Sequence, residues 1–218
     1  PFMGFRAIRY CLNNAEQYKV QLRALLRASA FGDIKIMLPL VTTVDEVRQA
    51  KALVEECKGE LDAKGVAYNK DIEVGTMIET PSASLIADKL ARECDFFSIG
   101  TNDLIGYTMC ADRGNDRVAY LYEVYQPSVL RSLKYLIGEG NKKKIMVGMC
   151  GEAAADPLLI PVLLSFGLDE FSVSAPSVLR TRKTIAAWTK AEADELTARV
   201  MELDTAAEVK ALLEREAR

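Results

Sequence analysis

The sequence predicts an α/β fold in which about five parallel strands alternate with helices. Two observations favour it: short β-branched runs recur between helix-like segments, and polar residues gather where these runs end. Strands separated by helices pair in parallel through right-handed crossovers. The pattern therefore indicates either an open doubly wound sheet or part of a β/α barrel.

The predicted strands are short apolar runs rich in β-branched residues. In chain order they are residues 34–41, 72–79, 95–99, 144–149 and 170–173. Each run is long enough for one buried strand, and the segments between them are long enough for a helix.

Local signals place the first helices between these strands. Thr43 with Glu46 three residues later has the spacing of a capping box, and the helix that follows is expected to end near Gly65. Thr80 followed by Pro81 predicts an N-cap with proline at the first helical position.

The remaining helices are expected in the second half of the chain. Ser128 and Asp156 are expected to open two helices in the same manner. The tail, residues 182–218, is expected to form two more, with a break at Asp204 and Thr205.

The position of the polar residues decides between the two architectures. Glu79, Asn102 with Asp103, and Cys150 with Glu152 all lie at the carboxyl ends of predicted strands. Barrel enzymes build their sites from several strands at this end. No G-x-G-x-x-G motif supports a doubly wound fold. The sequence therefore predicts the carboxyl-terminal part of a TIM (β/α)8 barrel, about five of its eight units, over residues 1–218 as one domain.

Composition excludes several classes of function. The 28 basic and 31 acidic residues give a net charge of −3 without a basic stripe, so nucleic acid is not an expected partner. No apolar run reaches the roughly 18 residues of a membrane span, so no membrane insertion is expected. Five cysteines without C-x-x-C spacing predict reduced thiols and a cytoplasmic location. With no histidine, any chemistry must use carboxylates, arginines, lysines or a thiol.

The strand-end residues suit an anionic ligand with a metal ion. Glu79, Asp103 and Asn102 form an oxygen-rich set of the kind that binds Mg²⁺. The alternative is that the two carboxylates only cap a helix and a turn. Arg113 could clamp a phosphate or carboxylate, or could be an ordinary solvated arginine. Cys150 could meet a substrate, or could be an inert buried thiol.

Motifs along nearly the whole chain resemble enzyme I of the bacterial sugar phosphotransferase system. They are Gly4-Phe5-Arg6, residues 27–32, Glu79-Thr80-Pro81, residues 96–104, residues 112–115 and residues 148–152. The wider family of enzymes that use phosphoenolpyruvate (PEP) includes pyruvate phosphate dikinase and PEP synthase. The loop that begins at Asp112 favours enzyme I within that family.

The resemblance implies a role for each matching residue. Glu79 and Asp103 would hold Mg²⁺, and Asp103 would also belong to the substrate-binding set. Asn102 and Arg113 would bind the phosphate and carboxylate oxygens of PEP, and Arg6 would add positive charge on the phosphate side. Cys150 would protonate the enolate to give pyruvate. These assignments agree with the chemistry of a loose phosphoryl-transfer transition state.

The same resemblance implies parts that this sequence does not contain. The family passes the phosphoryl group to a histidine of an amino-terminal domain and then to the carrier protein HPr, whereas this sequence has no histidine. Three earlier barrel strands with two phosphate-binding arginines have no counterpart before Pro1. The alternatives are a dikinase or synthase barrel, or a silent dimerisation module.

A homodimer is expected, both from the resemblance and because an open barrel exposes strand edges and its interior face. That interior face is expected to carry apolar side chains, which are Ile36, Leu38, Val74, Met77, Ile145 and Val147.

Overall fold

The computed structural model describes residues 3–218, and within them a single five-stranded parallel sheet is formed. The strands are β1 (Ile36–Leu38), β2 (Val74–Ile78), β3 (Phe96–Gly100), β4 (Met146–Cys150) and β5 (Glu170–Phe171). All five predicted strands are confirmed, and only β3 and β4 extend one residue beyond the predicted ranges.

The strands stand in chain order, and every neighbouring pair is parallel. A doubly wound sheet reverses its strand order at a switch point, whereas a barrel advances in one direction. The unreversed order confirms the predicted fold class, a partial β/α barrel. β1 and β5 are its two edges.

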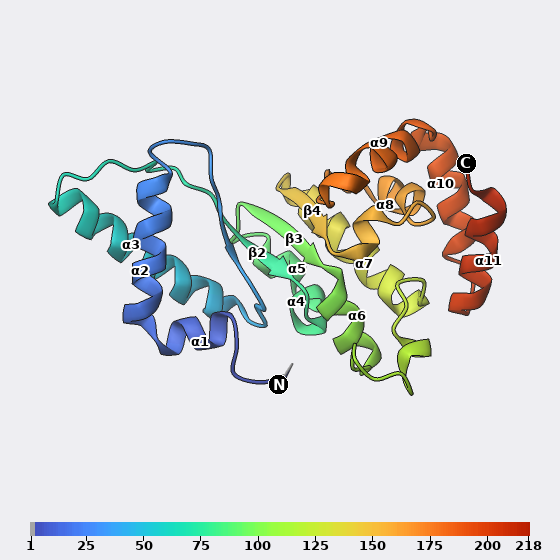
Figure 1. Ribbon diagram of the computed structural model, residues 1–218, viewed down its shortest axis with the longest axis horizontal. Helices are drawn as coiled ribbons and strands as arrows, with labels where there is room; N and C mark the ends of the chain where they lie inside the picture. The colour runs from blue at the N-terminus through green and yellow to red at the C-terminus, as the bar shows by residue number, and fades with distance from the viewer. Residues whose placement is uncertain (1–2) are drawn as a thin grey trace.

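Helices connect and flank the strands, with α1–α3 toward the β1 edge of the sheet and α8–α11 toward the β5 edge (Figure 1). The α-helices are α1 (Ile8–Asn13), α2 (Ala15–Ala28), α3 (Val44–Ala63), α4 (Pro81–Leu85), α5 (Ala87–Leu90), α6 (Thr101–Met109), α7 (Pro127–Lys143), α8 (Ile160–Phe166), α9 (Val178–Ala186), α10 (Lys190–Val200) and α11 (Ala206–Glu216). Short 3-10 turns are η1 (Ala119–Leu121), η2 (Glu152–Ala155) and η3 (Ala175–Ser177). Among residues 3–218, no helix has both the length and the apolar character needed to cross a bilayer.

Two helix starts form as predicted. Thr43 and Glu46 make a full capping box at α3, and the backbone turns left-handed at Gly65 just past the helix end. Thr80 caps α4 by accepting a hydrogen bond from the Ala83 N–H. The helix breaks at Ile86, so one predicted helix is two short ones, α4 and α5.

Other predicted boundaries are wrong by a few residues. The helix expected from Ser128 begins at Pro127, because proline occupies the first helical position. Asp156 caps only a turn, accepting from the Leu158 N–H, and α8 begins later, at Ile160. The tail holds α9 to α11 rather than two helices, with α9 beginning at Val178, before the predicted range.

One face of the sheet packs against the helices. Side chains on this face are almost fully buried, namely Ile36, Leu38, Val74, Ile78, Phe97, Ile99, Val147 and Met149. At Gly140 of α7 an added Cβ would lie 2.3 Å from Val147, so glycine is what allows this helix to approach β4.

The opposite face is open, and most of the side chains predicted to line it lie on the helix-packed face instead. Of the expected interior side chains, Ile36, Leu38, Val74 and Val147 point to the helices, and Ile145 packs against the same core. The register partner of Met77 is Ser98, which lines the open face. The sequence could not show which face each residue would take, because a parallel strand is apolar on both faces.

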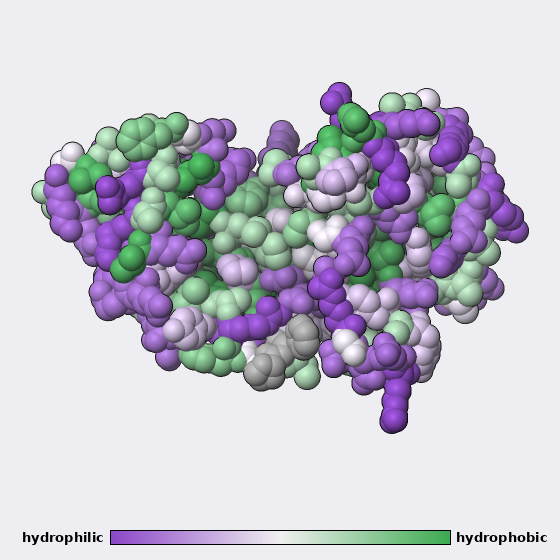
Figure 2. Space-filling view, in the orientation of Figure 1, coloured by the Kyte–Doolittle hydropathy of each residue, from purple (hydrophilic) through white to green (hydrophobic). Residues whose placement is uncertain are grey.

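The open face is hollow and partly apolar. It forms a cavity of about 310 Å³, lined by residues that include Met37, Phe96, Met146 and Glu170. Met37 is 40% exposed there. Hydrophobic surface gathers over the middle of the molecule, where β2 to β4 lie (Figure 2).

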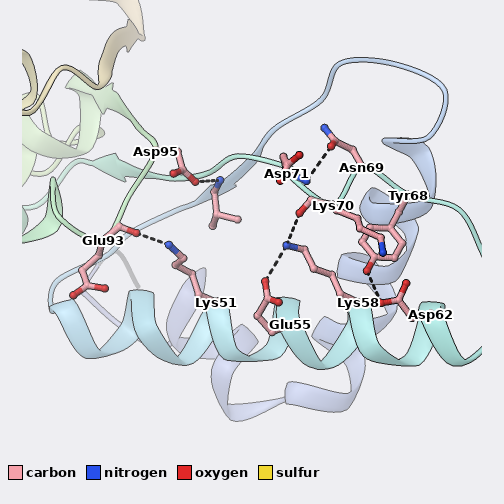
Figure 3. A network of polar contacts seen from close by, with 11 residues as sticks. Lys51, Glu55, Lys58, Asp62, Tyr68, Asn69, Lys70, Asp71, Glu93 and Asp95 are labelled. Carbon is pink, nitrogen blue, oxygen red and sulfur yellow. Dashed lines mark hydrogen bonds and ion pairs between the residues drawn. The ribbon is translucent and has the colours of Figure 1, made fainter.

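Polar contacts fasten α3 to the segments around the first strands (Figure 3). Lys51 reaches the Glu93 carbonyl at 2.7 Å, and Lys58 reaches the Lys70 carbonyl at 3.0 Å. Near the helix end, the Tyr68 hydroxyl donates to Asp62 at 3.0 Å. These contacts join α3 to the segments that lead into β2 and β3.

Candidate active site

Glu79 is a buried carboxylate directly after β2. Its side chain is only 7% exposed and accepts a 2.6 Å hydrogen bond from the backbone N–H of Leu40. A Cβ at Gly100 would lie 2.6 Å from the second carboxylate oxygen, so glycine makes room for Glu79 beside β3. Burial, together with the negative charge of Asp103, raises the pKa of Glu79 to about 7 despite the opposing effects of the Leu40 N–H and of Arg6.

Asp103 and Asn102 reach the same edge because α6 begins immediately after β3. Asp103 forms an ion pair with Nη2 of Arg6, which lies 97 residues earlier in the chain. The same Nη2 donates to the Tyr107 hydroxyl at 2.9 Å. The backbone carbonyl of Asn102 accepts a 2.7 Å hydrogen bond from Tyr122. The Asp103 carboxylate thus acts electrostatically on Glu79 and also forms the ion pair with Arg6.

Cys150 ends β4 opposite Gly100 in register, so its thiol stands in the same row of strand ends as Glu79. Its Sγ lies 3.5 Å from the Ile99 carbonyl oxygen. Burial raises the pKa of the Cys150 thiol, a hydrogen bond from Ser98 lowers it, and the charge of Glu79 raises it again. The net increase keeps the thiol protonated at neutral pH, as a proton donor requires.

Arg113 approaches from the loop after α6 and remains half exposed, with 52% of its side chain accessible. It pairs with Glu152, just beyond β4, at 2.9 Å. Together with Asn102 and Asp103 it lines a cavity of about 360 Å³. Neither Glu79 nor Cys150 lines this cavity. The structure therefore brings Glu79, Asp103, Arg6 and Cys150 together and leaves Arg113 at the rim.

Two contacts of the site were not predicted from the sequence. Tyr107 lies four residues after Asp103 on α6, a spacing that places both on one helix face and could have indicated the contact. Leu40 presents its N–H to Glu79 with a left-handed backbone, φ 56°. No sequence signal marks Leu40, because this conformation is rare for leucine.

The carboxylate oxygens of Glu79 and Asp103 suit a hard divalent cation. Among residues 3–218, no group of three or more His, Cys, Asp and Glu side chains is placed to hold a metal. Mg²⁺ needs only one or two carboxylates, because water and substrate oxygens complete its shell. A cation between Glu79 and Asp103 would offset the burial of the Glu79 charge and its repulsion from Asp103, both of which raise the pKa of Glu79.

Fold and site together define a class of protein: a partial β/α barrel with charged groups gathered at its carboxyl edge, the edge that barrel enzymes use. The chain belongs to the family of PEP-utilising enzymes, since the model of their PEP-binding domain matches residues 1–190. The resemblance drawn from the motifs is thereby confirmed.

Similar proteins extend the match to almost the whole chain. The phosphoenolpyruvate-protein phosphotransferase of Geobacillus stearothermophilus is 53% identical over 215 residues, which is 99% of this chain and 37% of that protein. The enzyme of the same name from Bacillus subtilis (strain 168) is 51% identical over 213 residues, 98% of this chain and 37% of its own length. This chain therefore spans a little over a third of the relatives it matches.

A solved structure supports the fold alone. A citrate lyase from Burkholderia xenovorans LB400 superposes with a TM-score of 0.57 at 18% sequence identity, covering 91% of this chain and 68% of that one.

Proposed function

We propose that this chain is the PEP-binding portion of a PEP-protein phosphotransferase and binds PEP together with Mg²⁺ at the carboxyl edge of the sheet. One observation carries the proposal: Glu79, Asp103, Arg6 and Cys150, from four separate segments, converge there. The relatives named above, each about half identical in sequence, support the choice of substrate.

Each residue has a defined task in this proposal. Glu79 and Asp103 hold the cation, which when bound offsets negative charge on the phosphoryl group and the carboxylate. Asp103 also faces the substrate. Arg6, Asn102 and Arg113 bind oxygen atoms of the phosphate and carboxylate. Cys150 gives its proton to the methylene carbon of the enolate, which becomes pyruvate.

The phosphoryl acceptor would lie elsewhere in the full-length enzyme, because this sequence has no histidine. We propose that an amino-terminal phosphohistidine domain takes the phosphoryl group and passes it to HPr. Residues 1–218 would then act as one partial barrel. We place the protein in the cytoplasm, which the free thiols Cys11, Cys57, Cys94, Cys110 and Cys150 favour. The names of the two relatives favour a phosphotransferase over a dikinase or synthase.

Calorimetric titration of this chain with PEP, with and without Mg²⁺, tests the proposal. We expect binding that requires Mg²⁺ but is weak, because two phosphate-binding arginines of the family are not in this sequence. Each lost contact to a charged group is worth about 1.5–3 kcal/mol, so affinity should fall by two or more decades relative to a complete barrel.

Asp103→Asn is the matched variant, since it preserves shape and removes one anionic ligand. It should abolish the Mg²⁺ dependence. If PEP binds equally with and without Mg²⁺, or does not bind at all, the chain is a silent module and the proposal is wrong.

We further propose that the chain self-associates as a dimer or higher oligomer through its open face. The cavity there exposes Met37, and β1 and β5 offer unpaired backbone groups. Sedimentation velocity should show a species larger than 24.1 kDa that dissociates on dilution. Met37→Lys on the open face should shift the equilibrium to monomer, whereas a compact wild-type monomer would contradict the prediction.

A further inference from the structure

Arg6 is held by two residues one turn apart on α6. Its Nη2 contacts both the Asp103 carboxylate and the Tyr107 hydroxyl, the latter at 2.9 Å. Positions four residues apart lie on one face of a helix, so α6 presents the two partners side by side. Nη2 carries two N–H donors and can therefore serve both at once.

The proposed function gives Asp103 and Arg6 ligands of opposite charge. Asp103 would bind the cation and Arg6 the phosphate, yet in the structure the two side chains form an ion pair with each other. Binding must therefore separate this ion pair. The side chains are 23% and 38% exposed, so the pair can open without uncovering a buried charge.

We propose that Tyr107 is a positioning residue, which keeps the Arg6 guanidinium at the site while Asp103 exchanges Arg6 for the cation. The Tyr107 hydroxyl is neutral and so does not compete with phosphate for the positive charge of Arg6. An arginine held by a hydrogen bond loses less conformational entropy on binding an oxyanion than a free one. The inference rests on the proposed function, because it assumes an anionic substrate and a cation at this edge.

The first arm of the test measures the ion pair alone. Mn²⁺, a paramagnetic substitute for Mg²⁺, is titrated without PEP and followed by electron paramagnetic resonance. Arg6→Ala frees Asp103, so Mn²⁺ should bind about five- to tenfold more tightly than to wild type. Tyr107→Phe leaves the Arg6–Asp103 pair in place and should change Mn²⁺ affinity by less than about twofold.

The second arm measures positioning through PEP affinity in the presence of Mg²⁺, followed by phosphorus NMR. Tyr107→Phe should weaken PEP binding about tenfold, as expected when a hydrogen bond to a charged group is lost. Tyr68→Phe is the matched control, since it removes a tyrosine hydrogen bond to Asp62 beside α3 and should have no effect (Figure 3).

The double variant of Arg6→Lys and Tyr107→Phe distinguishes positioning of Arg6 by Tyr107 from a purely structural role of Tyr107. A lysine cannot reproduce the forked donors of arginine. In the Arg6→Lys background, Tyr107→Phe should therefore cost less than about twofold. If Tyr107→Phe weakens PEP binding in the Arg6→Lys background as much as in wild type, or does not weaken it in wild type, the inference is wrong. The proposed function would still hold. If wild type shows no Mg²⁺-dependent PEP binding, the proposed function itself fails and the inference fails with it.

Discussion

Replacing Cys150 with serine should lower the turnover of a phosphotransferase that contains this chain by about 10²–10⁴-fold, the range of a lost proton donor. PEP affinity should change little, because serine keeps the size and polarity of the side chain. The thiol is suited to the role since burial raises its pKa and keeps it protonated. A serine hydroxyl is a much weaker acid and cannot protonate the enolate at a comparable rate.

A chimera in which this chain replaces the matching 37% of the Bacillus subtilis enzyme allows the measurement. Exchange of the pyruvate methyl protons with solvent reports the proton transfer directly. Cys110→Ser is the matched control, because Cys110 is an exposed thiol just after α6 that donates to the Tyr107 carbonyl and has no role in the proposed proton transfer. Wild-type exchange in the Cys150→Ser chimera would remove the thiol from the mechanism.

The strands could be predicted because their β-branched runs are short, buried and separated by helices. Helix starts were found where a side chain caps its own backbone, as Thr43 does with Glu46. The same pattern occurs at Thr189 with Glu192, and reading it would have given the third tail helix. The facing of the strands could not be predicted, because Ile36 and Met37 are both apolar and only packing of the helices selects one face.

The site also has parts that could be predicted from the sequence and parts that could not. Glu79, Asp103 and Cys150 could be placed together because parallel strands end at one edge. The contact between Arg6 and Asp103 joins segments 97 residues apart, and no local pattern specifies it. The Glu79–Leu40 hydrogen bond depends on a strained backbone that tertiary packing imposes. The residues at the strand ends could thus be predicted from the sequence, whereas the contacts between distant segments depend on the fold.

Without a cation, wild-type chain should lose stability as pH rises, and Glu79→Gln should remove this loss. The pKa of Glu79 is raised from 4.5 to about 7 in the folded chain, so between these values the folded state binds a proton that the unfolded state has released. Stability therefore falls as pH increases through this window. Above it, the buried carboxylate costs roughly 3 kcal/mol, which the glutamine variant should regain.

Urea unfolding at about pH 5 and about pH 8 measures the effect, with the largest gain for Glu79→Gln at the higher pH. Glu73→Gln, a half-exposed carboxylate paired with Lys35 beside β2, is the matched control and should show no such gain. Mg²⁺ should restore wild-type stability at about pH 8, because a ligand that binds only the folded state stabilises it, and should not affect Glu79→Gln. A wild-type chain whose stability is unchanged across this pH range would show that Glu79 stays ionised without a cation. The raised pKa of Glu79 could then no longer explain why this edge binds a metal ion.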